Sequence, residues 1–355
     1  MIGPRPVLAG LAVSCPPPLR QDDMWREFFA DHYAGPARAL AQRIFANAGV
    51  VTRHSVVNPL LEDVSRWSTG QRMQRYLLEA MPLGKEAVSG ALDSAGLDPA
   101  ELGMFAVCSC TGYVTPGLDI LLARDLGMSP HTQRLVVGHM GCYAALPGLG
   151  AVTDFVASRG RPALLLCLEL TTLHLQPPSR DPQQIVAHAL FSDAAAAVVV
   201  RPGDTVPGYA ETGYSVREVA AVTDTATADH MTWDVTDLGF RMGLSARVPD
   251  VLAQHVAAMV TELLDRHGRT VADVDGWAIH PGGPKILDTV RDRLGLTEDD
   301  LTASRETLAA HGNCSSPTVL LILDALRRRS RPPRTVVALA FGPGLTLYGA
   351  LLTTD

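Results

Sequence analysis

The chain has 355 residues, which suits two domains or one large domain with a substantial core. Hydrophobic residues make up 47% of it and charged residues 19%, a composition that excludes a disordered protein. The formal net charge is −7 and no long basic run occurs, which argues against nucleic-acid binding. No apolar run reaches the roughly 18 residues that a membrane-spanning helix needs, so we expect no membrane span.

The first segment, Pro6–Ser14, is a short apolar run that ends just before three prolines. We expect a strand here rather than a signal peptide, because Arg5 alone makes a poor charged region. A helical stretch is expected over residues 22–48. The six cysteines are scattered without a CxxC pair, which favours free thiols and a cytoplasmic protein. Cysteines in apolar strands are expected to be core thiols: Cys15, Cys108 and Cys167.

In each of two pairs of segments, both members have the same order of apolar, turn and amphipathic stretches. Residues 104–127 and 276–295 each read as an apolar run, a Gly/Pro turn and an amphipathic segment, which predicts strand, loop and helix. Residues 139–170 and 311–341 each read as a turn, a helix, a basic polar break and a continuous apolar strand. Such strands belong to sheets that are covered on both faces.

The two members of each pair lie about 170 residues apart, which indicates a duplicated α/β unit. Each half is predicted to be a sheet between helix layers. The turn-rich stretch at residues 201–208 is the expected boundary, dividing the chain into residues 1–204 and 205–355.

Equivalent turns of a duplicated fold face each other across the junction between the halves. The turn at Cys142 corresponds to the turn at Asn313, and the strand end at Cys108 corresponds to that at His280. We therefore expect Cys142, His280, Asn313 and the thiol of Cys110 to meet at one place.

Cys142 follows Gly141, which permits a tight turn, and precedes a predicted helix. A free thiol has a pKa near 8.5, and both a helix N-terminus and an imidazolium favour its anion. The alternatives are a buried core thiol at Cys142, a hydrogen-bonded core histidine at His280 and a helix cap at Asn313. The order Cys, His, Asn also fits a papain-like protease, but such enzymes carry the cysteine near the mature N-terminus in a CGSC[WY] context. Here it lies mid-chain in MGCYA.

Six segments carry a family resemblance: MGCYA at Cys142, LFSDAAAA at Phe191, DLGFRM at Phe240, WAIHPGGPKIL at His280, HGNCSSPT at Asn313 and FGPGLT at Gly342. Over almost its whole length the chain resembles type III polyketide synthases, the chalcone synthase-like branch of the thiolase superfamily. A ketoacyl-ACP synthase III, the alternative single-condensation enzyme, would read His-Gln-Ala-Asn and Gly-Asn-Thr-Ser at the histidine and asparagine. A third possibility is a scaffold that keeps the fold without catalysis.

The resemblance implies a thiolase-like duplicated αβαβα layered fold, a homodimer, and a buried site at the end of a pantetheine tunnel. It implies acyl-CoA starters and malonyl-CoA extenders, with no metal or redox cofactor. In the N-terminal half, Cys142 would be acylated by the starter. In the C-terminal half, His280 would hold Cys142 as thiolate, and His280 and Asn313 would stabilise the enolate formed on decarboxylation.

The resemblance also implies roles around the cavity. Phe191 and Phe240 match two gatekeeper phenylalanines, for which core packing is the alternative. Arg43 matches an arginine that binds CoA phosphate, while Asn47 replaces a family lysine and Lys285 is a substitute cation; each cation could equally be a solvated charge. The cyclisation cavity would be lined by a glycine-rich loop: Gly342, Pro343 and Gly344.

Further cavity positions depart from the plant enzymes. Cys110 replaces a threonine of the plant enzymes, as in the bacterial members. Thr171 keeps the threonine of the family, and His174 replaces another threonine. Glu169 matches a glutamate implied to polarise water in cyclisation, with a paired structural carboxylate as the alternative. Thr115 matches the family position whose side chain reaches into the cavity of the neighbouring subunit. We expect a fatty acyl-CoA starter and an alkylpyrone or alkylresorcinol product.

Overall fold

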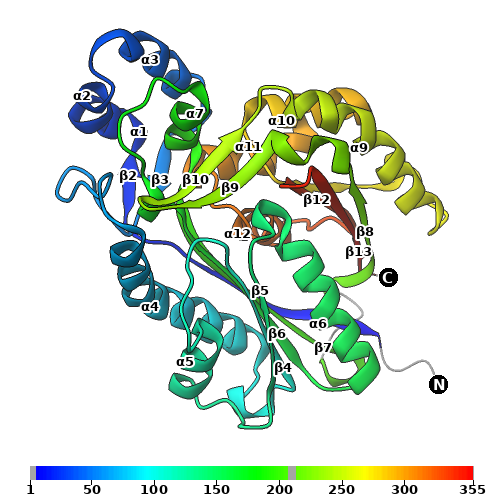
Figure 1. Cartoon of the computed structure of the whole chain (residues 1–355). Coiled ribbons are helices and arrows are strands. Elements are labelled where there is room, and N and C mark those ends of the chain that lie inside the picture. Colours follow the sequence, from blue (N-terminus) through cyan, green and yellow to red (C-terminus); the bar gives the residue numbers. More distant parts are fainter. Residues whose placement is uncertain (1–4, 207–212, 355) are drawn as a thin grey trace.

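The structure, a computed structural model, describes residues 5–206 and 213–354. Within these ranges the chain forms a five-stranded sheet, a four-stranded sheet and two small two-stranded sheets, with helices between and around them (Figure 1). The strands are β1 (Pro6–Ser14), β2 (Pro18–Arg20), β3 (Thr52–His54), β4 (Met104–Cys108), β5 (Gln133–Val137), β6 (Ala163–Leu170), β7 (Asp193–Pro202), β8 (Ser215–Thr223), β9 (Met231–Thr236), β10 (Gly239–Leu244), β11 (Gly276–Ile279), β12 (Thr335–Gly342) and β13 (Thr346–Thr353).

The α-helices alternate with these strands, as in other α/β folds. They are α1 (Gln21–Met24), α2 (Ala30–His32), α3 (Arg38–Ala46), α4 (Thr69–Ala95), α5 (Leu118–Asp125), α6 (Ala145–Arg159), α7 (Pro182–Leu190), α9 (Val248–Asp265), α10 (Pro284–Leu294), α11 (Glu298–His311) and α12 (Pro317–Arg327). None of the helices in the described part of the chain is both long and apolar enough to cross a membrane.

The two large sheets repeat one topology. In the first, β4 pairs with β6 in parallel, and β6–β7 and β7–β1 are antiparallel. In the second, β11 pairs with β12 in parallel, and β12–β13 and β13–β8 are antiparallel. β5 adds a further parallel edge strand to the first sheet. The duplicated unit expected from the sequence is therefore confirmed, with α6 and α12 as equivalent helices.

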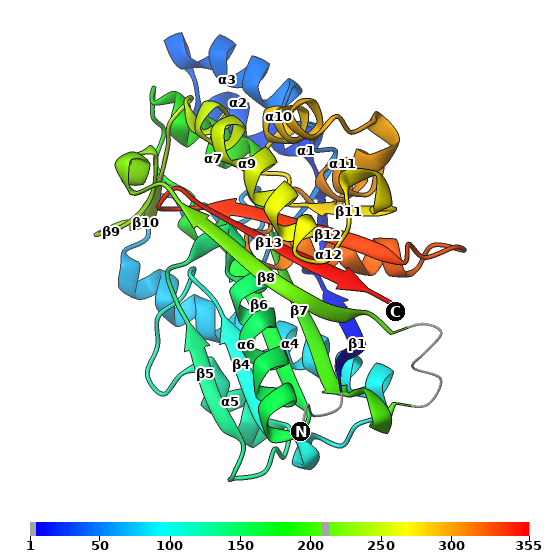
Figure 2. The same ribbon diagram turned by 90° about the vertical axis from the view of Figure 1, so that its right-hand side faces the viewer.

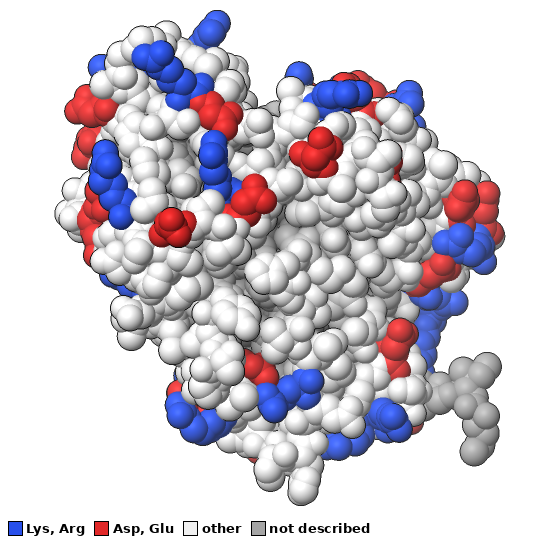
Figure 3. Space-filling view, viewed as in Figure 1, with Lys and Arg blue, Asp and Glu red and all other residues white. Residues whose placement is uncertain are grey.

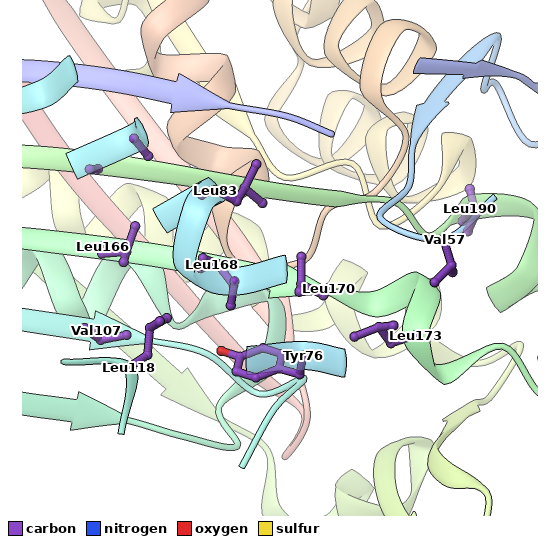
Figure 4. Close-up of a cluster of buried hydrophobic side chains, with 14 of the residues drawn as sticks. Val57, Tyr76, Leu83, Val107, Leu118, Leu166, Leu168, Leu170, Leu173 and Leu190 are labelled. Carbon is purple, nitrogen blue, oxygen red and sulfur yellow. The ribbon is translucent and has the colours of Figure 1, made fainter. Parts of the chain in front are cut away.

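Five layers stack in the order helix, sheet, helix, sheet, helix (Figure 2). α4 covers the outer face of the first sheet, α6 and α12 lie between the sheets, and α9 covers the outer face of the second sheet. β6 reads ALLLCLEL and is buried along its whole length, because helices cover both of its faces. Figure 4 shows one interface of the stack, where Leu166 and Leu168 of β6 lie beside Leu83 and Tyr76 of α4.

Two expectations need correction. The stretch expected to be helical from residue 22 to residue 48 is broken after α2 ends at His32, and a tight turn, Gly35–Ala37, precedes α3, which ends at Ala46. Proline lacks an N–H and disfavours the helical conformation in the preceding residue, and Gly35 takes a φ of 82°. Cys15 is not a core strand thiol: it follows the end of β1 and is half-buried, whereas Cys108 and Cys167 are buried opposite each other in β4 and β6.

Between the two halves, β7 ends at Pro202 and β8 begins at Ser215. The last two residues of the turn-rich stretch 201–208 lie outside the described residues.

Candidate active site

An apolar cavity of about 650 Å³ runs from the surface to the junction of the two halves. Its walls come from both halves, with Ile44 of α3, Leu190 of α7, Val248 of α9 and Ile286 of α10. Figure 3 shows the surface hollowed between the lobe of α1–α3 and α7 and the lobe of α9–α11. Its lining residues include the thiol, imidazole and carboxamide expected to converge: Cys142, His280 and Asn313.

Cys142 lies in a short helical turn, Gly141–Tyr143, that leads directly into α6. Gly141 has a φ of 73°, and a Cβ atom at this position would lie 2.9 Å from Cδ of Pro343. Only glycine satisfies both constraints without a shift of the backbone. The sequence MGCYA therefore fixes Cys142 at the base of the cavity, with its neighbour Tyr143 stacked on Tyr348 of β13.

Asn313 is positioned by backbone pairing with the other half. Its N–H donates to the carbonyl of Leu190 (2.8 Å), and its carbonyl accepts from the N–H of Ser192 (3.0 Å). Its side-chain Oδ1 accepts from the N–H of Ser315 (2.8 Å), and Ser315 takes a φ of 56°, which is rare outside glycine. Because Oδ1 is engaged, the side-chain NH₂ is the group that remains to donate into the cavity.

His280 directly follows β11, and its N–H donates to the carbonyl of Leu339 in β12 (2.8 Å). Its side chain is buried, and neither ring nitrogen has a hydrogen-bond partner within the described residues. Burial lowers the pKa of His280 to about 3. An imidazole with both nitrogens free in a dry cavity is available to a ligand.

Burial also raises the pKa of Cys142 to about 12, although hydrogen bonds from Ser315 and Asn313 oppose that rise. Neither the isolated thiolate nor the isolated imidazolium is therefore favoured in this cavity. A thiolate at neutral pH therefore needs a cation close by, and His280 lines the same cavity as Cys142. Ser315 was missed from the sequence; its position two residues after Asn313 was the available signal.

Beyond Cys142 the space is small. A cavity of about 20 Å³ is lined by Cys110, Cys142, Thr171, Trp233 and Pro343, among others, and holds one or two water molecules at most. A second cavity, of about 50 Å³, contains four residues expected to line the cavities: Thr171, His174, Phe191 and Phe240. Phe191 borders all three spaces, and so does Met242, which was not identified from the sequence.

Trp233 lines both small cavities and was not identified from the sequence. Its Nε1–H donates to the carbonyl of Cys110 (2.8 Å), and its ring packs edge-on against His174 and Phe240. A single tryptophan between two polar strand residues gives no signal of this role. His174 stacks on Phe240 at 4.5 Å between ring centroids and accepts the N–H of Phe240 at Nδ1.

Glu169 is fully buried in β6 and does not border these cavities. Its carboxylate accepts from the N–H of Cys110 (3.0 Å), the hydroxyl of Thr111 (2.7 Å) and the hydroxyl of Ser316 (2.9 Å). Burial raises the pKa of Glu169 to about 7 despite these donors. The contacts match a carboxylate that holds the loops beside Cys142 in place.

The remaining expected residues lie further out. Lys285 borders the large cavity and is exposed. Arg43 is exposed on α3 and is not among the residues that line the cavity, whereas Asn47, directly after α3, is. Thr115 borders a separate surface hollow of about 360 Å³. Gly342 packs against Tyr143 rather than bordering a cavity, and Gly344 contacts Thr346; of this loop, Pro343 reaches the small cavity.

A duplicated five-layer α/β fold with a cysteine, a histidine and an asparagine at the end of an apolar tunnel defines a thiolase-fold condensing enzyme. Residues 34–204 match the N-terminal domain of the chalcone and stilbene synthases, and residues 217–354 match their C-terminal domain. The chain belongs to this family and is a type III polyketide synthase, an acyltransferase that condenses acyl units and cyclises the product.

The relatives cover nearly the whole chain. A 1,3,6,8-tetrahydroxynaphthalene synthase from Streptomyces peucetius subsp. caesius is 37% identical, over 97% of this chain and 92% of that protein. The α-pyrone synthesis polyketide synthase-like Pks18 of Mycobacterium tuberculosis is 31% identical, over 97% and 90%. The crystal structure of PKS-I from the brown alga Ectocarpus siliculosus superposes with a TM-score of 0.90 at 27% identity, covering 99% of this chain and 98% of that one. The ketoacyl-ACP synthase III alternative finds no support among these proteins.

If His280 accepts the proton of Cys142, alkylation of Cys142 should depend on His280. In His280→Ala the proton acceptor is gone, so the raised thiol pKa persists and alkylation by iodoacetamide at pH 7 falls by at least about tenfold. Because that pKa lies above the working range, the rate in the variant should climb by roughly a factor of ten per pH unit from pH 7 to 9. Peptide mass spectrometry assigns the label, with Cys142→Ala as the blank. Equal rates and profiles in the two proteins would remove His280 from this role.

Proposed function

We propose that this type III polyketide synthase loads an acyl group from a CoA thioester onto Cys142 and extends it with malonyl-CoA. One observation carries the proposal: a thiol, an imidazole and a carboxamide lie at the closed end of an apolar cavity of about 650 Å³. Such a cavity suits a pantetheine arm, and its inner end is dry enough for charge-stabilising donors to act strongly. The reaction needs no metal or redox cofactor.

In the loading step, His280 accepts the proton of Cys142, and the thiolate attacks the carbonyl carbon of the acyl-CoA. The bond between that carbon and the CoA sulfur breaks, and the CoA thiol leaves with a proton from His280. The product is an acyl thioester on Cys142, so one difficult transfer becomes two easier ones.

In the extension step, malonyl-CoA loses carbon dioxide, and the electron pair of the broken bond forms an enolate. Its negative charge falls on the thioester oxygen, where His280 and the side-chain NH₂ of Asn313 donate. The enolate carbon then attacks the acyl carbonyl on Cys142 and releases the thiolate. One proton taken up from solvent then restores Cys142 and His280 to their loading state. Donors fixed before the reaction stabilise the developing charge without reorganising.

The outer end of the cavity is the proposed place for the CoA phosphates. Lys285 at the rim is a cation suited to a phosphate, and Arg43 on the same side offers a second one in solvent. Screening by salt makes both contributions small, so the apolar wall carries most of the binding free energy.

For the product, we propose a fatty acyl-CoA starter and an alkylpyrone or alkylresorcinol. The spaces beyond Cys142 are lined mainly by apolar side chains, Phe191, Trp233 and Met242 among them, which favours an alkyl chain. The two relatives differ here, one named for α-pyrone synthesis and the other for tetrahydroxynaphthalene synthesis. Identification of the starter and the ring therefore needs an experiment on this chain.

We further propose a cytoplasmic homodimer. β5 is an edge strand whose Val136 is 57% exposed, and the nearby Tyr113 is 70% exposed beside the hollow that contains Thr115. An unpaired edge with exposed apolar groups is a usual site of association. The middle of the face in Figure 3 also carries few charged side chains. A monomer in sedimentation velocity at micromolar concentration would refute the dimer.

The defining experiment mixes the purified chain with labelled malonyl-CoA and a panel of acyl-CoA esters from acetyl to long-chain. We expect cyclised polyketides without added carrier protein, with fatty acyl-CoA esters giving the highest turnover. Cys142→Ala should abolish both product and starter labelling, because the nucleophile is gone. Product formed only with acyl-carrier protein would contradict the proposal, and product formed by Cys142→Ala would move the nucleophile to Cys110.

Asn313 can be tested by two variants that separate its side-chain donor from its turn. Asn313→Ala removes both, whereas Asn313→Asp keeps an acceptor for the N–H of Ser315 and removes the NH₂. Both should slow carbon dioxide release from malonyl-CoA by ~10²- to 10³-fold, as for loss of one oxyanion donor. A near-normal rate in Asn313→Asp would show that the turn, and not the donor, is what matters.

Trp233 is expected to limit product size, because it borders both the 20 Å³ and the 50 Å³ cavities. Trp233→Ala should join them and allow at least one further extension from the same starter, visible as a higher product mass. Trp233→Phe keeps a ring there and should leave the product distribution nearly unchanged. The same distribution from all three proteins would refute the role.

A further inference from the structure

Cys15, His54 and His311 form a cluster, and none of the three lines the reaction cavity. Cys15 follows β1, His54 ends β3 and His311 ends α11, so three distant parts of the sequence meet. One potential ligand atom from each residue lies within 4.8 Å of the other two. The Sγ of Cys15 is 3.7 Å from Nδ1 of His311, and the two imidazole rings stack at 5.0 Å.

One separation within the cluster matches a tetrahedral metal site. Zinc bonds of about 2.3 Å to sulfur and about 2.0–2.1 Å to nitrogen, at a tetrahedral angle, separate the two ligand atoms by about 3.6 Å. The observed 3.7 Å between Cys15 and His311 is close to this separation. His54 is also oriented as a ligand, because its Nδ1–H donates to the carbonyl of Pro16 (2.7 Å) and leaves Nε2 with a free lone pair.

The surroundings suit a divalent cation. Two carboxylates lie near the cluster: Glu86 accepts from the hydroxyl of Ser14 (2.6 Å), next to Cys15, and Asp193 accepts from the N–H of Val56 (2.9 Å), two residues after His54. All three cluster residues are half-buried, so an ion has access from solvent and a water molecule can complete its coordination. A thiolate with two imidazoles selects zinc over magnesium or calcium, which prefer oxygen ligands.

We propose that Cys15, His54 and His311 form a Zn²⁺ site with solvent as the fourth ligand. On binding, the S–H bond of Cys15 gives way to a Zn–S bond, the proton goes to solvent, and nothing is oxidised or reduced. The site is separate from the reaction, which needs no metal.

Its position gives the ion a structural role near catalysis. His311 precedes Asn313 by two residues, and the N–H of His54 donates to the hydroxyl of Ser192 (2.7 Å). Ser192 in turn donates its N–H to the carbonyl of Asn313 (3.0 Å). Zinc therefore ties β3 and the end of α11 to the segments that hold Asn313, and it should raise the melting temperature of the chain.

The test uses the full chain without a histidine tag, made metal-free by a chelator. Cys142→Ala serves as the background protein, because Cys142 beside His280 is another possible thiolate site. Cobalt should give a thiolate charge-transfer band, and equilibration with zinc followed by dialysis should leave about one ion per chain by emission spectroscopy. Adding Cys15→Ser or His311→Gln to this background should abolish both signals.

Two controls distinguish a site from general metal affinity. His131→Gln removes an exposed histidine outside the cluster and should leave zinc content unchanged. His54→Cys supplies another zinc ligand and should retain the ion, which a packing role would not predict. In the unaltered chain, zinc should protect Cys15 from alkylation, a measurement that needs no variant. No bound ion in the background protein, an ion retained without Cys15 and His311, or no protection of Cys15 would each overturn the proposal.

Discussion

A backbone bridge between Phe191 and Asn313 is the constraint on which the rest of the site depends. It joins the end of α7 in the first half to the turn before α12 in the second half. The two hydrogen bonds on either side of it, to Leu190 and from Ser192, fix the height of Asn313 above Cys142. Neither half alone contains a complete site, because the thiol comes from one and the imidazole and carboxamide from the other.

Desolvation is the second determinant of the chemistry. The same burial that raises the pKa of Cys142 lowers that of His280, so the charged form of each group is disfavoured when it forms alone. The donors proposed to act on the enolate would gain strength from the same dry surroundings. Burial of polar groups without partners, costly for stability, is what makes the site reactive.

The shape of the interior decides how far a chain can grow. The cavity proposed for CoA is large and apolar, whereas Trp233 borders both of the small cavities beyond Cys142 and Phe191 borders all three spaces. Rigid rings define such boundaries well, because they lose little conformational freedom when they are packed. His311, in the proposed zinc site, and Asn313, in the reaction cavity, are two residues apart. One short segment of the chain therefore contributes to both sites.

The sequence by itself determined the duplicated α/β architecture, since continuous apolar strands and amphipathic segments recur at a fixed spacing. It also gave the grouping of Cys142, His280 and Asn313, because equivalent turns of a repeat must face one another. Only the tertiary structure placed Trp233 and Ser315 near Cys142. It also showed that Thr115 and Arg43 do not line the large cavity. The cluster of Cys15, His54 and His311 was likewise visible only in the structure. Such contacts join residues far apart in the chain, and periodicity carries information about the face a side chain occupies but none about its distant neighbours.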